Sequence, residues 1–434
     1  MCASASVFSP NTLLIVPFSE LGTKSRKTRE NMMTQLLTNI KHVLKDVFGV
    51  MWTKYRTKGE RLIFQFRKGD LKKASHALSF IPGILKYYQT IEGESKISSI
   101  IKRLNKITPE YGKLYVDELT GRYFNKGDEG QFIAELIQKI RNQHDIQIAP
   151  SYSFAGSNEK EKSRETEDLN ISIEVHPDFT YIWNNKSEIQ GLDGFPVGSQ
   201  NPLLIEIMSR PSDILSALGV MMRGVVISPI YYHLGKYATD MKLFAEMMDE
   251  CKKIISKYHG FPVMREFYVN LDEIFTLLFK KKKDLMENYP CITCIILRRL
   301  LSLEIINSNG MAPFLVCGAS RLNFPNINKT CPVELETKEY KISDVSLHLL
   351  TPALLQSPMG VNYVNSLYNQ LGIDNCRNDV EKSKTCFSWN YCGLKNDNTD
   401  LNKKNIDLEI VKKEIISCLK PRVNKFIKMS EKRW

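Results

Sequence analysis

The chain has 434 residues, of which 43% are hydrophobic and 25% charged, a composition typical of globular proteins with material for about three domains. No apolar run approaches the roughly 20 residues that cross a bilayer, which excludes a helical membrane span. The first residues lack the basic and long apolar segments of a secretory signal, so we expect a cytoplasmic protein with no membrane partner.

The chain carries a net charge of +12. This charge is compatible with a polyanionic partner and equally with a generally lysine-rich protein, and both alternatives stay open. The ten cysteines are scattered and include one CxxC pair. Without a secretion signal, they indicate reduced thiols, metal binding or catalysis rather than a disulfide framework.

Residues 10–90 are predicted to form a ferredoxin-like α+β domain with β-α-β-α-β order. Residues 11–18 and 61–66 form strands, a helix follows each of them, and another strand begins near Ile84. Between the first strand and its helix lies a basic turn with the sequence SELGTKSRKTR, residues 19–29. It is either a solvated loop or a surface for an anionic partner.

Residues 91–187 are predicted to form a second α+β domain. Helices at 97–104 and 131–142 flank a strand at 113–116, and the last strands form a hairpin. The hairpin strands, 171–175 and 181–183, are joined by the turn Pro177-Asp178, whose residue types favour a tight turn.

Residues 188–395 are predicted to form a doubly wound, mostly parallel α/β domain. A glycine-rich turn at 191–198 precedes a strand at 202–208, a polar break, a helix at 214–222 and a strand at 225–232. This is a βαβ unit, and its first loop lies where nucleotide phosphates usually bind. Further predicted elements are a helix at 239–258, a strand at 263–269, helices at 271–279 and 295–307, and a strand at 313–316. Residues 396–434 are predicted to form a basic helical tail.

Several motifs resemble the ThiI family of tRNA 4-thiouridine sulfurtransferases. They are the turn GLDGFPVG at 191–198, the helix end Met222-Arg223-Gly224, the basic turn at 19–29, the Pro82-Gly83-Ile84 step and the hairpin ISIEVHPDFTYIW at 171–183. The resemblance spans nearly the whole chain. It implies a ferredoxin-like domain, an RNA-binding THUMP domain at 91–187 and a PP-loop-like α/β domain.

The resemblance implies thiolation of a tRNA uridine to 4-thiouridine. ATP with Mg²⁺ would adenylate the uracil O4 atom, and sulfur carried by a cysteine would displace AMP. The sulfur would arrive as a persulfide from a cysteine desulfurase, and a homodimer stays open. The alternative is a non-catalytic tRNA-binding protein that has kept the scaffold and lost the adenylation site.

The phosphate loop of the family is SGGxDS, and here both glycines are replaced within the segment Ser209 to Asp213. Pro211 has no N–H to donate, whereas the hydroxyls and the Arg210 charge can still contact phosphate. The loop therefore either binds ATP or only caps the following helix. The ATP-binding candidates are Ser209, Arg210, Ser212, Asp213, Gly318 and Arg298.

Cys291 and Cys294 are spaced to share a metal, a cluster or a disulfide, although two ordinary thiols remain the alternative. Cys392 resembles the late cysteine of the family. By this resemblance the three residues are the catalytic candidates, acting either through a persulfide or as ligands of an iron–sulfur cluster.

The candidates for tRNA binding lie in the basic turn of the first domain. They are Lys24, Arg26, Lys27 and Arg29.

Overall fold

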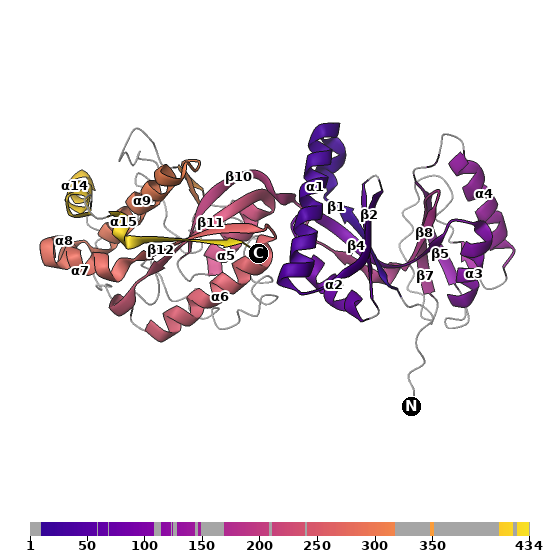
Figure 1. Ribbon diagram of the computed structural model, residues 1–434, viewed down its shortest axis with the longest axis horizontal. Helices are drawn as coiled ribbons and strands as arrows, with labels where there is room; N and C mark the ends of the chain where they lie inside the picture. Colours follow the sequence, from indigo (N-terminus) through magenta and orange to yellow (C-terminus); the bar gives the residue numbers. More distant parts are fainter. Residues whose placement is uncertain are drawn as a thin grey trace, which may run out of the picture. The chain divides into compact units, whose positions relative to one another are not determined.

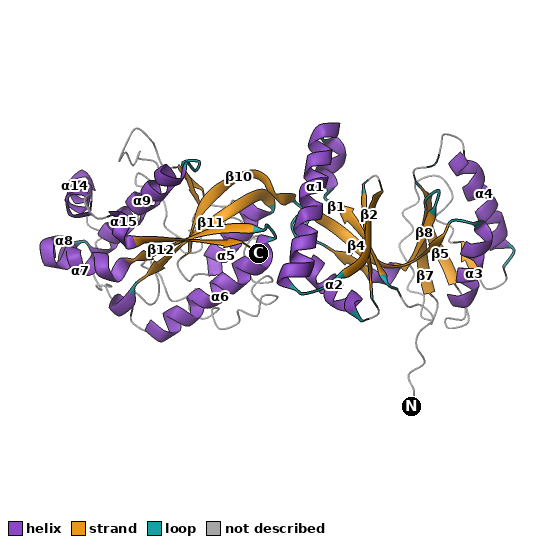
Figure 2. Ribbon diagram, viewed as in Figure 1, coloured by secondary structure: helices purple, strands orange, loops and turns teal. Residues whose placement is uncertain are grey.

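The computed structural model contains two compact units that divide between Gly194 and Phe195 (Figure 1). The described residues are 10–316, 348–350 and 408–433, with shorter gaps at 59, 68, 108–113, 123, 125–127, 144–145, 149–168, 208–210, 239–240 and 420–422. Both units combine strands with helices (Figure 2), so the predicted multidomain class is confirmed. Among the described helices, none is long and apolar enough to cross a bilayer.

The first half of the N-terminal unit has the ferredoxin-like order β-α-β-β-α-β. Its elements are β1 (Thr12–Pro17), η1 (Ser19–Thr23), α1 (Arg26–His42), η2 (Val43–Val47), β2 (Trp52–Lys58), β3 (Arg61–Phe66), α2 (Asp70–Leu78) and β4 (Ile84–Glu94). Strand β2 was not predicted from the sequence. It is an edge strand with no buried residue, so it lacks the apolar alternation that reveals a half-buried strand.

Helix α1 begins inside the segment that was expected to be a turn. The Ser25 hydroxyl accepts a hydrogen bond from the Thr28 N–H at 3.3 Å, which is an N-cap contact. The basic residues from Arg26 onward therefore lie on the first helical turns. Leu36 and Ile40 of α1 are fully buried against the strands, so the apolar stripe of the helix fixes its orientation.

The second half of the N-terminal unit places two helices, α3 and α4, beside its strands (Figure 1). Its elements are α3 (Ile97–Ile107), β5 (Leu114–Gly121), α4 (Asp128–Arg141), β6 (Ile146–Ile148), β7 (Leu169–Val175), β8 (Phe179–Asn184), η5 (Asn185–Ser187) and β9 (Glu188–Gln190). The predicted hairpin is present, because β7 pairs antiparallel with β8. Leu104 of α3 and Ile140 of α4 are buried in the core beneath the helices.

Strand β4 belongs to both halves of this unit. Its first part pairs with β1, and residues 91–94 pair with β8. The strands therefore form one sheet in the order β2-β3-β1-β4-β8-β7-β5-β6, with β9 also paired to β4. A shared strand couples the two halves through backbone hydrogen bonds rather than through a loop.

Two glycine-containing motifs of the sequence meet at the end of the N-terminal unit. The Gly83 N–H donates to the Asp193 carbonyl at 2.8 Å, and the Asp193 N–H donates to the Ile84 carbonyl at 2.8 Å. A Cβ atom at Gly191 would overlap the Ile84 carbonyl, so only glycine fits this close approach. The Pro-Gly-Ile step and the later glycine turn thus form one structural feature.

The C-terminal unit is a sheet flanked by helices. Its elements are β10 (Phe195–Ile207), α5 (Pro211–Met221), β11 (Arg223–His233), η6 (Gly235–Tyr237), α6 (Met241–His259), β12 (Val263–Asn270), α7 (Leu271–Lys281), α8 (Lys283–Asn288), α9 (Pro290–Asn309), β13 (Phe314–Val316), β14 (His348–Leu350), α14 (Leu408–Leu419), α15 (Val423–Phe426) and β15 (Ile427–Arg433). The sheet order is β14-β13-β10-β11-β12-β15. All neighbours are parallel except β15, which pairs antiparallel with β12.

Three local features differ from the sequence analysis. Strand β10 begins at Phe195, within the expected glycine turn. Helix α9 begins at Pro290, so the CxxC pair lies inside the helix rather than before it. The expected helical tail ends in strand β15, whose residues complete an edge of the sheet.

Candidate functional site

The carboxyl end of β10 is a topological switch point. Its chain neighbour β11 pairs on one side, and β13 pairs on the other side. Ligands of open parallel sheets bind at such a point, beyond the ends of the strands. Strand β10 ends at Ile207 and β13 ends at Val316, so both following loops leave the sheet at this edge.

Helix α5 begins just beyond this edge. Pro211 is its first residue, a position that suits proline because its missing N–H would have no partner within the helix. Asp213 lies in the first turn and is fully buried. Of the other nucleotide candidates, Ser209, Arg210 and Gly318 lie outside the described residues, as does the side chain of Ser212.

A buried group of charges joins α9 to the end of β10. Arg298 Nη1 lies 2.7 Å from Oε1 of Glu206, and Arg299 Nη1 lies 3.2 Å from Oε2 of the same carboxylate. Burial alone would lower the pKa of Arg298, but the Glu206 charge, with contributions from Cys294 and Tyr232, raises it. Arg298 is therefore held as a cation in the core, and its nucleotide contact stays a prediction.

Tyr232 connects β11 to the same group. Its hydroxyl lies 3.2 Å from Ser302 Oγ and donates to the Arg298 carbonyl at 3.4 Å. Burial, and then the nearby Glu206 carboxylate, raise the pKa of Tyr232, so the phenol stays neutral. Strands β10 and β11 are thereby both attached to α9.

The cysteine pair lies at the beginning of α9. Cys291 and Cys294 are three residues apart on one helix, which places them on the same face. Cys294 is buried, and its side chain interacts with Arg298. Cys392 and the side chain of Cys291 lie outside the described residues. Within the described part of the chain, no group of three metal-ligating side chains is present.

His233 was missed by the sequence analysis, although it directly follows the apolar run that predicted β11. It is exposed at the carboxyl end of that strand, at the same edge of the sheet where β10 ends. Its ring stacks on Tyr268 with centroids 6.2 Å apart. Desolvation by the neighbouring protein, and then Lys252, lower the pKa of His233, so the imidazole is neutral at neutral pH.

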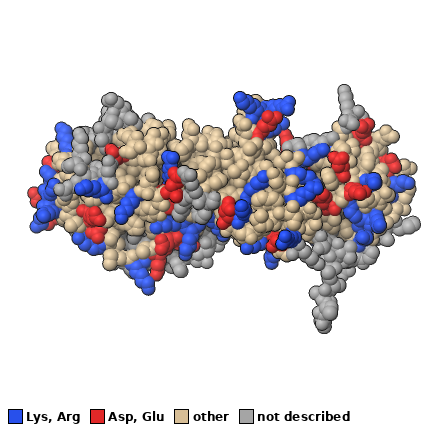
Figure 3. Space-filling model, viewed as in Figure 1, with Lys and Arg blue, Asp and Glu red and all other residues tan. Residues whose placement is uncertain are grey.

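The basic residues predicted to contact tRNA lie beside carboxylates. Lys24 lies 3.6 Å from Glu20, Arg26 lies 2.9 Å from Glu30, and Arg29 lies 3.2 Å from Glu60. Lys27 is exposed on the first turn of α1. On the face drawn in Figure 3, basic and acidic side chains are likewise interspersed. The turn therefore offers less net positive charge than its sequence suggests.

A second ion network lies within the N-terminal unit. Glu174 of β7 contacts Arg61 of β3, Arg122 and His176, at 3.0 Å, 3.0 Å and 2.8 Å. Burial would raise the pKa of Glu174, but hydrogen bonds from His176 and Arg61 lower it to about 2. The network ties a strand of the first half of the unit to a strand of the second.

Comparison with known proteins agrees with this architecture. A family model described as the ThiI ferredoxin-like domain matches residues 13–87. A probable tRNA sulfurtransferase of Thermococcus kodakarensis is 23% identical over 302 residues, which cover 65% of this chain and 70% of the relative. A probable tRNA sulfurtransferase of Staphylococcus aureus is 22% identical over 248 residues, 57% of this chain and 56% of the relative.

Two solved structures share the fold. One is a crystal structure of a 4-thiouridine synthetase–RNA complex with bound ATP, with a TM-score of 0.65, 14% identity and coverage of 98% of this chain and 100% of the other. The second is a Pyrococcus horikoshii Ot3 protein, with a TM-score of 0.54, 18% identity and coverage of 83% and 99%.

The two units have different folds. A ferredoxin-like domain and a second α+β half form one unit, and a doubly wound α/β sheet forms the other. Residues 13–87 match the ThiI ferredoxin-like domain, and the chain as a whole is similar in sequence to tRNA sulfurtransferases and in fold to a 4-thiouridine synthetase.

Proposed function

We propose that this protein is a tRNA sulfurtransferase that uses ATP to convert a tRNA uridine to 4-thiouridine. The observation that carries the proposal is the contact between Glu206 and Arg298. Glu206 stands one residue before the end of β10, and Arg298 follows Cys294 by one helical turn. The contact supports the proposal because it holds α9, the helix that carries the cysteine pair, against the end of the strand before the loop expected to bind phosphate.

The names of the relatives and the ATP-bound, RNA-bound structural neighbour support the same proposal. We assign the residues from Ser209 to Asp213, with Gly318 and Mg²⁺, to the phosphates of ATP. ATP supplies the activation of the uracil O4 atom. With Pro211 in the loop, this chain has fewer backbone donors than a glycine loop, so we expect weak binding of free ATP. In this proposal Arg298 acts by holding α9 against β10.

Sulfur transfer is assigned to Cys291, Cys294 and Cys392. Two routes suit these residues: a persulfide received from a cysteine desulfurase, or a cluster held by the three thiolates with one open iron. In both routes a bond would form between sulfur and C4 of the uracil, the C4–O bond would break and AMP would leave. In the persulfide route the thiolate of a second cysteine then attacks the inner sulfur, which breaks the S–S bond, leaves the outer sulfur on C4 and forms a disulfide that an external thiol must reduce before the next turnover. The first unit, together with Lys24, Arg26, Lys27 and Arg29, is assigned to tRNA binding. A homodimer is compatible with these assignments.

The test is to express the full chain in cells that make no 4-thiouridine and to analyse their tRNA by mass spectrometry. We expect 4-thiouridine with the wild type and its loss with Cys294→Ser. The matched control is Cys418→Ser, because Cys418 is buried like Cys294 but lies on α14. Absence of 4-thiouridine from the wild type, together with intact tRNA binding, would favour the non-catalytic alternative.

ATP binding is measured separately by calorimetric titration with Mg²⁺ and tRNA present. Asp213→Ala is expected to abolish the heat of binding. If Asp213→Ala binds ATP as the wild type does, the assignment of the α5 terminus to phosphate is wrong even if thiolation occurs.

A further inference from the structure

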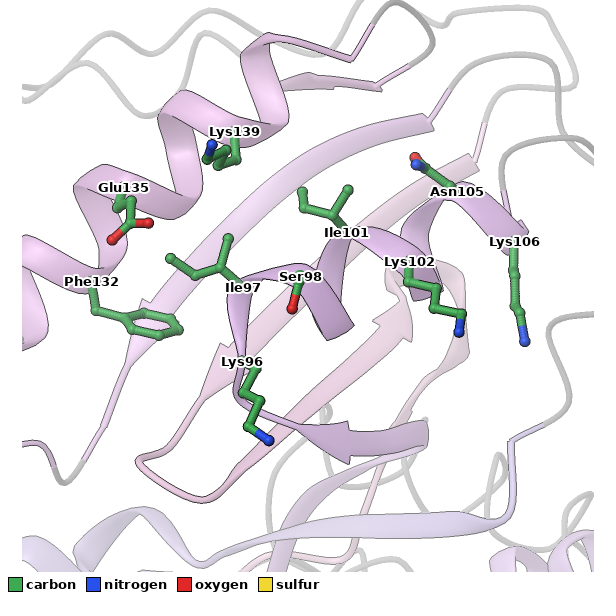
Figure 4. A pocket seen from close by; sticks show the side chains of 10 residues that line it. All are labelled: Lys96, Ile97, Ser98, Ile101, Lys102, Asn105, Lys106, Phe132, Glu135 and Lys139. Carbon is green, nitrogen blue, oxygen red and sulfur yellow. The ribbon is translucent and has the colours of Figure 1, made fainter.

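A groove lies between helices α3 and α4 of the N-terminal unit (Figure 4). It encloses about 980 Å³ and is open to solvent along its length. Near one end, Asn105 Nδ2 donates to Gln143 Oε1 at 3.3 Å, which links the C-terminal ends of the two helices. This contact joins the two helices at one end of the groove.

The floor of the groove is apolar. Ile97 and Ile101 project from α3 toward α4, and the Phe132 ring projects from α4 toward α3 (Figure 4). These three side chains are half-buried, whereas Ile100 and Leu104 of α3 are fully buried in the core. Helix α3 therefore has a second apolar stripe that the fold only partly covers, and such a stripe can bury an apolar partner.

The rim of the groove is basic. Lys96, Lys102 and Lys106 extend from the α3 side, and Lys139 extends from α4, against the single carboxylate of Glu135. Lys96 lies 3.5 Å from Glu94. For the other three lysines, the described part of the chain provides no ion pair within 4.0 Å. The rim therefore complements acidic groups.

We propose that this groove binds an amphipathic helix of a protein partner, with an apolar face on the floor and acidic residues along the lysine rim. A groove with an apolar floor between two helices matches the helix-in-groove mode of peptide recognition. A nucleic-acid backbone uses the lysines but gains nothing from two isoleucines, and bases prefer open aromatic faces. The Phe132 ring packs against the Phe124 ring, with ring centroids 5.5 Å apart, so it is not an open face for a base. The Glu135 carboxylate would also repel a phosphate at the rim.

The probe is a fluorescent peptide of about 18 residues, or five helical turns, with leucines on one face and glutamates elsewhere. Anisotropy titration of the full chain is expected to show binding that weakens with salt. Peptides with the leucines changed to glutamine, or the glutamates changed to lysine, are expected not to bind. An unstructured RNA oligonucleotide of similar length is titrated in parallel.

The groove variant combines three substitutions, Lys102→Glu, Lys106→Glu and Lys139→Glu. It is expected to bind the acidic peptide about tenfold more weakly than the wild type, or weaker still. The matched control is Lys45→Glu, Lys72→Glu and Lys73→Glu, three exposed lysines elsewhere in the unit, which should change affinity by less than about twofold. Ile97→Gln should weaken binding without changing its salt dependence. Melting curves check the fold of each variant.

Three outcomes would overturn the proposal. The acidic peptide does not bind the wild type, it binds the groove variant and the control equally, or only the RNA loses affinity in the groove variant. The last outcome would identify the lysines as a phosphate-binding surface instead.

Discussion

Arg298 Nη1 lies 2.7 Å from Oε1 of Glu206, and both side chains are almost completely buried. Because Glu206 also neutralises Arg299, we expect Glu206→Leu to destabilise the C-terminal unit more than Arg298→Met does. Glu206→Leu removes the carboxylate that both buried guanidinium groups contact, whereas Arg298→Met leaves Glu206 paired with Arg299. Breaking a buried ion pair by removing one partner typically costs about 3–5 kcal/mol, so Glu206→Leu is expected to lose at least that much and Arg298→Met less. Urea unfolding curves measure both losses.

The control for this pair is Lys253→Met, which breaks an exposed pair with Glu250 at 3.5 Å. It should change stability by no more than about 0.5 kcal/mol. Equal effects of Arg298→Met and Lys253→Met would show that the buried group does not hold α9 against the sheet.

Glu174 makes the stability of the N-terminal unit depend on acid. Its pKa is lowered to about 2 in the folded chain, below the value of about 4.3 in unfolded chains. The resulting stabilisation, about 3 kcal/mol, is therefore fully present above about pH 4.3 and is lost as the pH falls toward 2. Glu174→Gln should lower the stability at pH 7, and its deficit should shrink in this acidic window.

Unfolding of the wild type and Glu174→Gln is followed by urea titration at several pH values. Glu94→Gln is the control, because Glu94 is exposed and pairs with exposed Lys96. A deficit of Glu174→Gln that is the same at pH 7 and pH 3 would contradict the assigned ionisation.

Gly224, at the junction of α5 and β11, cannot accept a side chain. Its φ is +85°, and an added Cβ would overlap the Ser199 hydroxyl. Gly224→Ala is expected to cost about 1–3 kcal/mol. Gly130→Ala in α4, where nothing lies within 4 Å of an added Cβ, should instead stabilise by up to about 1 kcal/mol. Melting temperatures of the two variants should move in opposite directions.

The first helical turn of α1 is expected to contribute to tRNA binding. Neutralising Lys24, Arg26, Lys27 and Arg29 together should weaken tRNA binding and reduce its dependence on salt. Because the other three lie beside carboxylates, Lys27→Ala should account for much of the loss. Filter binding across a salt series measures both quantities.

Lys72→Ala with Lys73→Ala is the control for this surface, since both lysines are exposed on α2. Unchanged affinity and salt slope in the four-residue variant would remove this turn from the tRNA-binding surface.

Iron and sulfide analysis after anaerobic purification separates the two sulfur routes. If a cluster carries the sulfur, iron should be present in the wild type and lost in Cys291→Ala, Cys294→Ala and Cys392→Ala. Cys251→Ala should keep its iron, because Cys251 lies on α6. An iron-free wild type that still thiolates tRNA would leave the persulfide route.

The sequence predicted elements well wherever one side of a helix or strand is buried. Strong apolar periodicity is present in three such places: helix α1, the hairpin of β7 and β8, and the unit from β10 to β11. Strand β2 was missed because none of its residues is fully buried and the strand has no apolar alternation. The charged strand β15 was taken for a helix, since its pairing with β12 depends on residues more than a hundred positions earlier.

The candidate site could be predicted only in part. The position of the loop before α5 followed from the strand–loop–helix pattern. The ion pairs of Arg298 and Arg299 did not, because their partner Glu206 lies on a strand about ninety residues away. A basic pair in a sequence shows its charge but not which carboxylate it meets after folding. The same limit applies to Glu174 and its neighbours Arg61, Arg122 and His176.

Strand β15 has a consequence for the synthesis of the chain. The N-terminal unit is finished when residue 194 has emerged from the ribosome, so it can fold while translation continues. The C-terminal sheet needs Ile427–Arg433 to complete its edge, and these residues are made more than 150 positions after β12. Until they emerge from the ribosome, β12 exposes unpaired backbone groups, which are able to recruit a chaperone or a strand of another nascent chain.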